Sequence, residues 1–278
     1  VNIGLEGLMV MGFFAAALTI YKLEPVMPNA GLRVLLGLVA AIVAGMLFSL
    51  LHAVASINMK ANQVISGTAI NMMAGALTVY LARTITGSGN ILITAGVTRF
   101  DVPGLVKIPV LGPLLFRQTY ITTWLVLALL AVSWYLLYKT PFGLRLRACG
   151  EHPHAAASAG INVYRMRYFG VLVSGAYSAL GGAIILLTYS GEFSGSVSGL
   201  GFLALAALIF GQWKPLGVLG ASFFFGFAST IANVSQAIPA LMTIPPILLK
   251  TFPYIVTLVA LVLFSKSSQA PKAEGIPF

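Results

Sequence analysis

Side chains that could carry out chemistry are few in this chain, which has six acidic residues, three histidines and one cysteine. A lone cysteine, Cys149, excludes an internal disulfide and a cysteine metal cluster. His152 and His154 lie two positions apart, so they do not share one helical face, and no metal site is predicted. The sequence also lacks paired carboxylates, a His-Glu-x-x-His helix and a Ser/His arrangement, which disfavours a membrane-embedded enzyme. It contains no Gly-x-x-x-x-Gly-Lys-Ser/Thr phosphate loop, so neither ATP nor another cofactor is expected to bind.

The residues that remain as candidates are polar groups in or beside long apolar stretches. An ionisable group within a membrane is costly and is therefore a functional candidate. For Glu6, an interfacial or packing role is an equally good interpretation. For Asn71, a hydrogen bond between helices is slightly favoured over contact with a solute. Because few fixed charges lie in these stretches, the pattern indicates a pathway for a neutral solute, with these candidate lining residues: Asn2, Glu6, Asn71, Glu192 and Asn233.

The elements that must position these residues are membrane helices. The chain is 59% hydrophobic and only 8% charged, with a mean hydropathy of +0.97, whereas soluble domains carry about 25% charged residues. The net charge of +10 comes from cations scattered between apolar stretches, so topology explains it better than nucleic-acid binding does. Composition therefore predicts an all-α polytopic membrane protein.

About eight membrane segments are predicted, with both chain ends on the cytoplasmic side. Residues 201–211 are too few for a full span, so a short or broken helix is expected near 199–211, of the kind that marks binding sites in transporters. One segment carries Gly170, Ser174, Ser178 and Gly182 at every fourth position, which predicts a close-packed face. The predicted segments are 8–21, 31–57, 62–83, 119–138, 168–189, 201–211, 215–231 and a last one from Pro245 to near Phe264.

The most distinctive part of the sequence is 139–167, where five cations flank an alanine-rich centre opposed only by Glu151. A basic loop between two apolar stretches belongs on the cytoplasmic face. Pro153 suits the first position of a helix and Gly160 the position just past its end, which predicts about two helical turns with little side-chain bulk. Such a helix can enter a groove on another protein. A surface helix that docks nothing is an equally good interpretation.

This segment, with G-L-R-L-R-A-C-G-E-H-P-H-A-A-A-S-A-G-I-N at its centre, resembles the cytoplasmic coupling segment of permease subunits in bacterial ABC importers. Three other stretches resemble the same family, so the similarity covers essentially the whole chain: V-N-I-G-L-E-G, A-N-Q-V-I-S-G-T-A-I-N and G-F-L-A-L-A-A-L-I-F-G-Q-W-K-P-L-G. The nearest branch is that of the nucleoside and simple-sugar permeases, which are relatives of the ribose and branched-chain amino acid permeases.

The resemblance implies a single transmembrane permease domain over 1–278, with a cytoplasmic coupling loop at 139–167 and an extracytoplasmic loop at 84–118. The implied partners are an ATP-binding cassette subunit, a second permease subunit that is homologous but different, an extracytoplasmic substrate-binding protein and membrane lipids, without nucleic acid. The family also has an apolar helix ahead of the position of Val1, so one is expected to precede it. Contact with the ATPase is implied for Arg147, Gly150, Glu151, Pro153, Ala156 and Gly160.

The function that the resemblance implies is that of a non-catalytic transmembrane subunit of an ATP-driven importer in the bacterial cytoplasmic (inner) membrane. It would form half of the translocation pathway for a neutral solute. Nucleosides are the favoured solutes, and a simple sugar such as ribose or xylose is the alternative. A stand-alone channel remains as an alternative of a different class, and co-purification with an ATPase would distinguish it from the importer.

Overall fold

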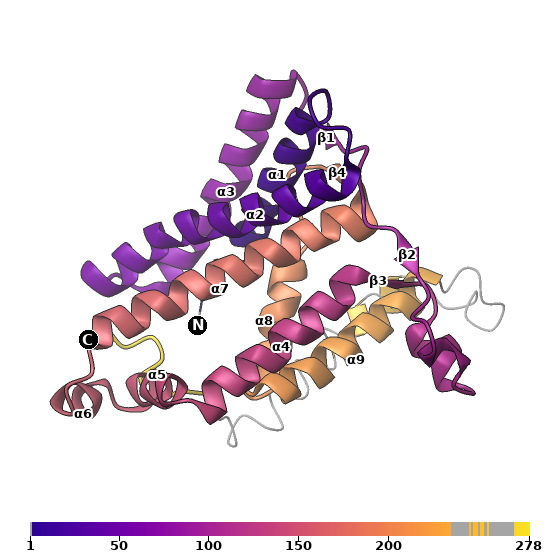
Figure 1. Cartoon of the computed structure of the whole chain (residues 1–278). Coiled ribbons are helices and arrows are strands. Elements are labelled where there is room, and N and C mark those ends of the chain that lie inside the picture. Colours follow the sequence, from indigo (N-terminus) through magenta and orange to yellow (C-terminus); the bar gives the residue numbers. More distant parts are fainter. Residues whose placement is uncertain (1, 235–244, 246, 250, 253–254, 256–269) are drawn as a thin grey trace. The chain divides into compact units, whose positions relative to one another are not determined.

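The computed structural model describes residues 2–234, 245, 247–249, 251–252, 255 and 270–278. These residues form two compact units, Val1–Gly201 with Gly275–Phe278, and Phe202–Glu274. Most of the described chain is helical (Figure 1). The α-helices are α1 (Leu5–Leu23), α2 (Ala30–Ala53), α3 (Gln63–Thr86), α4 (Ile121–Lys139), α5 (Pro141–Glu151), α6 (Pro153–Ser158), α7 (Val163–Ile185), α8 (Leu200–Phe210) and α9 (Pro215–Val234). Short helical turns are η1 (Val54–Asn58), η2 (Leu105–Lys107), η3 (Gly112–Phe116) and η4 (Leu186–Ser190), and the strands are β1 (Ile91–Leu92), β2 (Arg99–Phe100), β3 (Thr119–Tyr120) and β4 (Glu192–Phe193).

Six helices in the described ranges are long and apolar enough to cross a membrane, and they match six predicted segments. They are α1, α2 with η1, α3, α4, α7 with η4, and α9. Between α7 and α9 lies α8, an apolar helix of 11 residues. This length confirms the short helix predicted near 199–211. The last predicted segment, which begins at Pro245, falls largely outside the described residues.

The core of the first unit is a close bundle of α1, α2 and α7. Small residues allow the three backbones to touch. A β-carbon on Gly12 of α1 would lie 2.0 Å from the carbonyl oxygen of Ala179, and one on Gly182 of α7 would lie 2.0 Å from the carbonyl oxygen of Met9. Both distances are far below van der Waals contact, so neither position accepts a larger residue without moving a helix.

The close-packed face of α7 differs from the predicted stripe. The positions in tight contact are Gly175, Ala179 and Gly182, whereas a β-carbon on Gly170 would meet only the Leu146 side chain, at 4.0 Å. Ser174 does face the bundle, but through a hydrogen bond rather than close backbone contact. The physical reason is helical pitch. Steps of four residues exceed one turn of 3.6 residues, so an unbroken every-fourth pattern drifts off the contact face, and the real face mixes steps of four and three.

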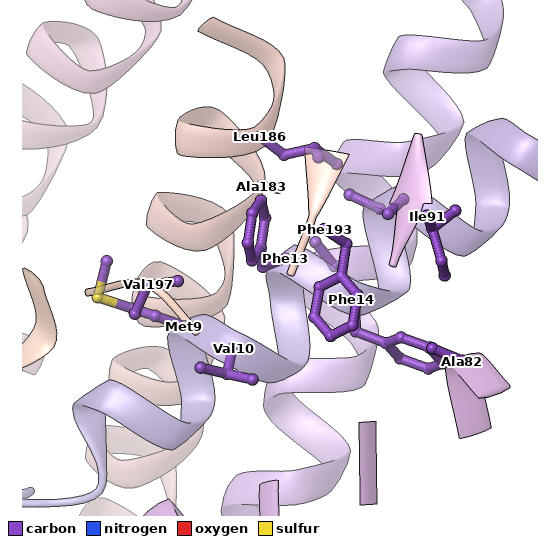
Figure 2. Close-up of a cluster of buried hydrophobic side chains, with 13 residues drawn as sticks. Met9, Val10, Phe13, Phe14, Ala82, Ile91, Ala183, Leu186, Phe193 and Val197 are labelled. Carbon is purple, nitrogen blue, oxygen red and sulfur yellow. The ribbon is translucent and has the colours of Figure 1, made fainter. Parts of the chain in front are cut away.

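Residues 84–118, for which the family resemblance implies an extracytoplasmic loop, contain short strands that pair. Strand β1 pairs antiparallel with β4, and β2 pairs antiparallel with β3. Figure 2 shows Phe193 of β4 beside Phe13 and Phe14 of α1. The Phe193 ring makes edge-on contacts with both, at centroid distances of 5.3 and 5.4 Å. Together with the buried Ile91, this packing attaches the connection to the α1–α2–α7 bundle.

In the second unit, α8 and α9 form a tight helical hairpin. A β-carbon on Gly211 would lie 2.3 Å from the backbone nitrogen of Val218, so the turn between the helices has no room for a side chain there. Ala207, Ala221 and Phe225 form its buried apolar cluster.

Candidate functional site

The start of α1 is surrounded by polar side chains that come from several helices. Asn71 projects from the middle of α3. Its Oδ1 accepts a hydrogen bond from the backbone N–H of Gly7, at 2.7 Å, and its Nδ2 donates to the carbonyl of Ile3, at 3.0 Å. The first N–H groups of a helix have no partner within the helix. Asn71 therefore caps α1 from a neighbouring helix, and the predicted hydrogen bond between helices is confirmed.

Glu6, in the first turn of α1, does the same for α8. Its Oε1 accepts from the backbone N–H of Gly199, at 2.9 Å, and its Oε2 accepts from that of Gly201, at 2.7 Å. A carboxylate is well matched to a helix start because the backbone N–H groups there carry a partial positive charge. A β-carbon on Gly201 would lie 2.5 Å from the Glu6 backbone, so glycine is required for this approach. Glu6 thus has a defined partner within the protein.

Asn2 completes the group, which we call the α1-start cluster: Asn2, Glu6, Asn71, Ser174, Gly199 and Gly201. The Nδ2 of Asn2 donates to the Ser174 hydroxyl on α7, at 3.1 Å, and its Oδ1 accepts from the N–H of Gly4. The cluster therefore links α1, α3, α7 and the first turn of α8. Three of the five predicted pathway residues belong to it.

The other two predicted pathway residues lie elsewhere. Glu192 is in β4, where it pairs with Leu92, and its carbonyl accepts from the Ser190 hydroxyl. The adjacent Phe193 packs on Phe13 and Phe14 in the middle of α1, about two helical turns along the helix from Glu6. Asn233 is exposed near the end of α9, in the second unit. Glu192 is therefore outside the α1-start cluster, and Asn233 belongs to the other unit.

Both helix starts in the α1-start cluster already have side-chain partners within the protein. Two helix starts would ordinarily attract an anion. Here the carboxylate of Glu6 already occupies the α8 start, and the amide of Asn71 occupies the α1 start. The side-chain amides of Asn2 and Asn71 both donate and accept hydrogen bonds within the protein. No group of three or more histidine, cysteine or acidic side chains in the described ranges has metal-binding geometry.

The second candidate region is the turn of α5 and α6. Thr140 caps α5 by accepting from the N–H of Gly143, and Pro141 occupies the first helical position. Gly143 fits tightly against the end of α4, because a β-carbon there would lie 2.1 Å from the carbonyl oxygen of Leu136. The Arg147 guanidinium lies over the Tyr138 ring at 4.8 Å. α5 is thereby held against α4 at a fixed angle.

The short helix predicted from Pro153 and Gly160 is confirmed as α6. Pro153 is its first residue, and the ring nitrogen of His152 accepts from the N–H of Ala155. At the other end, Gly160 has a left-handed backbone with φ of 80°. Its N–H bonds to the carbonyl of Ala157, and that of Ile161 bonds to the carbonyl of Ala156. These two bonds form the glycine-based helix stop known as a Schellman motif.

The six residues predicted to contact an ATPase divide by exposure. Arg147, Glu151 and Gly160 are exposed, and Gly150 is partly exposed. Pro153 and Ala156 are buried, and Ala156 joins Cys149 and Val163 in an apolar cluster beneath α6. The first group thus lies at the surface of the turn, while Ala156 of the second packs α6 against α5 and α7.

Cys149 lies inside this cluster, with 3% of its surface exposed. Burial raises the pKa of its thiol, and the neighbouring Arg167 cation offsets part of that shift. At neutral pH the side chain is therefore a protonated, apolar packing residue rather than a nucleophile.

Some contributing residues were not singled out from sequence. Ser174 belonged to the small-residue stripe and Gly199 to a glycine- and serine-rich run, so both carried a weak signal. No sequence pattern indicated a partner for Gly201 or Phe278, because the elements that these residues contact are distant in the sequence. Phe278 packs against α6 and α7 although more than 100 residues separate it from them.

The six helices of the described ranges that are long and apolar enough to cross a membrane, together with the family match, define a multi-pass α-helical protein of the cytoplasmic membrane. The chain belongs to the family described as branched-chain amino acid transport system / permease component, which matches residues 1–261. It is a permease subunit and not itself an enzyme.

Curated relatives cover the whole chain. It is 45% identical to the guanosine ABC transporter permease protein NupQ of Bacillus subtilis, over 100% of this chain and 87% of the relative. It is 41% identical to the nucleoside ABC transporter permease protein NupC of Lactococcus lactis, with the same coverage. A more distant match is the guanosine ABC transporter permease protein NupP of Bacillus subtilis, 27% identical over 81% of this chain and 64% of that protein. No solved structure matches the chain.

Proposed function

We propose that this chain is the transmembrane subunit of an ATP-driven nucleoside importer and forms half of its translocation pathway. The observation that carries the proposal is identity of 45% and 41% with two permeases named for guanosine and nucleoside transport, each over the full chain. The α1-start cluster supports a neutral solute, because its one carboxylate is already bonded to the start of α8. Within the cluster, we expect the pathway residues to be Asn2, Glu6 and Asn71. Two further pathway candidates, Glu192 and Asn233, remain separate from it.

The turn of α5 and α6 is the proposed docking element for the ATPase. Its exposed surface comprises Arg147, Glu151 and Gly160, and its buried Pro153 and Ala156 attach it to the bundle. Because α5 packs on α4 and α6 packs on α7, a force on this turn is transmitted to two membrane helices.

A direct route leads from this turn to the α1-start cluster. Only four residues separate α6 from α7, and the last of them, Asn162, caps α7 by accepting from the N–H of Arg165. Ser174, bonded to Asn2, lies eleven residues after Val163, which is about 16 Å along the same helix. A tilt or shift of α7 driven by the ATPase would therefore act on the cluster without an intervening flexible segment.

The second permease subunit in this proposal is a different chain. Bacillus subtilis has two proteins named as guanosine ABC transporter permeases, and this chain is 45% identical to one and 27% identical to the other. Two such unequal relatives in one organism support a heterodimer. An extracytoplasmic substrate-binding protein would deliver the solute.

The substrate assignment is tested by reconstituting the complete transporter in liposomes and measuring ATP-driven uptake of guanosine, uridine and ribose. Uptake of nucleosides that requires internal ATP is the expected result. Uptake of ribose alone would overturn the nucleoside assignment, and uptake without ATP or the ATPase would favour a channel.

The docking element is tested by photo-cross-linking from single cysteines in a Cys149→Ser background. Ala155→Cys lies on the exposed side of α6 and is expected to cross-link the ATPase subunit. Tyr189→Cys is the matched control, since it is 81% exposed at the opposite end of the α7 span. Cross-linking of the ATPase from Tyr189→Cys, or its absence from Ala155→Cys, would contradict the proposed docking element.

A further inference from the structure

The end of the described chain returns to the turn of α5 and α6. Residues Gly275–Phe278, which we call the tail segment, belong to the same compact unit as α1–α7, although the residues preceding them do not. Figure 1 shows the C-terminal end beside α6 and the start of α7. Nothing in the sequence pattern requires this return, so the contacts that hold the tail segment there are specific features of the fold.

These contacts are polar at the backbone and aromatic at the side chain. The Arg167 guanidinium donates to the carbonyl of Ile276, at 3.0 Å, and the Tyr164 hydroxyl donates to the carbonyl of Phe278, at 3.3 Å. The Phe278 ring lies 5.1 Å from the His154 ring of α6 and 5.4 Å from the Tyr164 ring of α7. The Arg167 cation is 6.0 Å from the same ring. Phe278 therefore bridges α6 and α7.

α6 needs such support because it is only six residues long. A helix of that length is not stable by itself, so packing must hold it in place. Its buried residues are Pro153 and Ala156, which are small, and the cluster beneath them consists of Cys149, Ala156 and Val163. Phe278 is the only aromatic residue in the described structure that packs against this cluster.

We propose that the tail segment positions the docking element, with Phe278 as the residue that fixes α6 to the start of α7. Undocking of the tail would leave α6 able to move independently, so that force from an ATPase would be absorbed at the turn rather than passed into α7. The positioning of α6 stands on the contacts above. Its consequence for transport rests on the proposed function of the turn.

The first test uses Cys149 as an internal reporter in the complete transporter in nanodiscs. Phe278→Ala is expected to increase the rate of maleimide labelling at Cys149 at least about tenfold, the factor that corresponds to a loss of about 1.4 kcal/mol. Ile276→Ala is the matched control, because the Ile276 side chain is 54% exposed and only its backbone carbonyl bonds Arg167. Phe278→Leu, which keeps apolar bulk, should label more slowly than Phe278→Ala. Equal labelling of wild type and Phe278→Ala would overturn the positioning role.

The second test measures nucleoside uptake per ATP hydrolysed, alongside the amount of ATPase subunit that co-purifies. For Phe278→Ala we expect uptake per ATP to fall while the subunits still assemble, and for Ile276→Ala no change. Arg167→Met, which removes the tail hydrogen bond from the α7 side, should reproduce the uncoupling without altering the tail segment.

The outcomes separate this inference from the proposed function. Exposure of Cys149 with unchanged uptake per ATP would show that the tail segment only stabilises the turn and would overturn its role in coupling. If wild-type protein neither binds an ATPase nor imports a nucleoside, the proposed function fails, while the labelling test still decides whether Phe278 holds α6.

Discussion

Removing the Glu6 carboxylate should release the start of α8. Glu6→Ala deletes both acceptors for the N–H groups of Gly199 and Gly201. We expect the free energy of local opening to fall by about 2–4 kcal/mol, since a hydrogen bond to a charged group contributes about 1.5–3 kcal/mol and water restores part of it. Glu6→Gln keeps one acceptor oxygen and should lose about half as much, about 1–2 kcal/mol.

Hydrogen–deuterium exchange of the peptide that contains Gly199 and Gly201 reports this opening directly, because protected amides exchange through local unfolding. A tenfold change corresponds to about 1.4 kcal/mol, so exchange should accelerate about 30- to 1,000-fold in Glu6→Ala and about 5- to 30-fold in Glu6→Gln. Glu192→Gln is the control, since Glu192 participates in the β1–β4 pairing through its backbone. It should leave the α8 amides unchanged.

Two results would refute the reasoning about Glu6. Acceleration below threefold in Glu6→Ala would mean that the carboxylate does not hold the α8 start in the membrane. Equal acceleration in the alanine and glutamine variants would mean that the acceptor geometry is irrelevant and that charge alone acts. Either result would show that Glu6 does not hold the start of α8 through the two hydrogen bonds described.

Three further predictions concern the other parts of the fold. Asn71→Leu leaves one N–H and one carbonyl at the α1 start without their side-chain partner, which costs about 1–3 kcal/mol of stability for each group. We expect uptake to be lost while the complex still assembles. Normal uptake would remove Asn71 from the pathway. Gly182→Ala should lower the yield of folded protein and its unfolding temperature. Gly170→Ala should not, because its β-carbon would make only an ordinary contact with the Leu146 side chain, at 4.0 Å; equal behaviour would contradict the close packing of α7. Because burial raises the pKa of Cys149, with Arg167 offsetting part of the shift, its alkylation should begin at higher pH in folded than in denatured protein. The thiol of the unfolded chain ionises first, near its ordinary pKa of about 8.5. The free energy of unfolding therefore keeps its full value below that pH and falls as pH rises above it. Coincident alkylation curves for folded and denatured protein would contradict the burial.

Much of the membrane architecture was predictable because the signals are local. In the part of the chain that the structure describes, six helices long enough to span a membrane and the short α8 follow from apolar length alone. The ends of α6 follow from Pro153 and Gly160, whose backbone preferences act within one turn. The α7 contact face was only partly predictable, because small residues occur on more than one face and a step of four residues drifts from the true one.

The sequence by itself determined the class of protein, the spans and the basic turn at 139–167, since hydropathy, charge and helix-end preferences depend on neighbouring residues. Only the tertiary structure decided which polar residues meet. Asn71 caps α1 and Glu6 caps α8 across sequence separations of 64 and 193 residues. The return of Phe278 to α6 was decided in the same way. A polar residue in an apolar stretch must find a partner, but its partner depends on how the helices pack, and that is a property of the whole bundle.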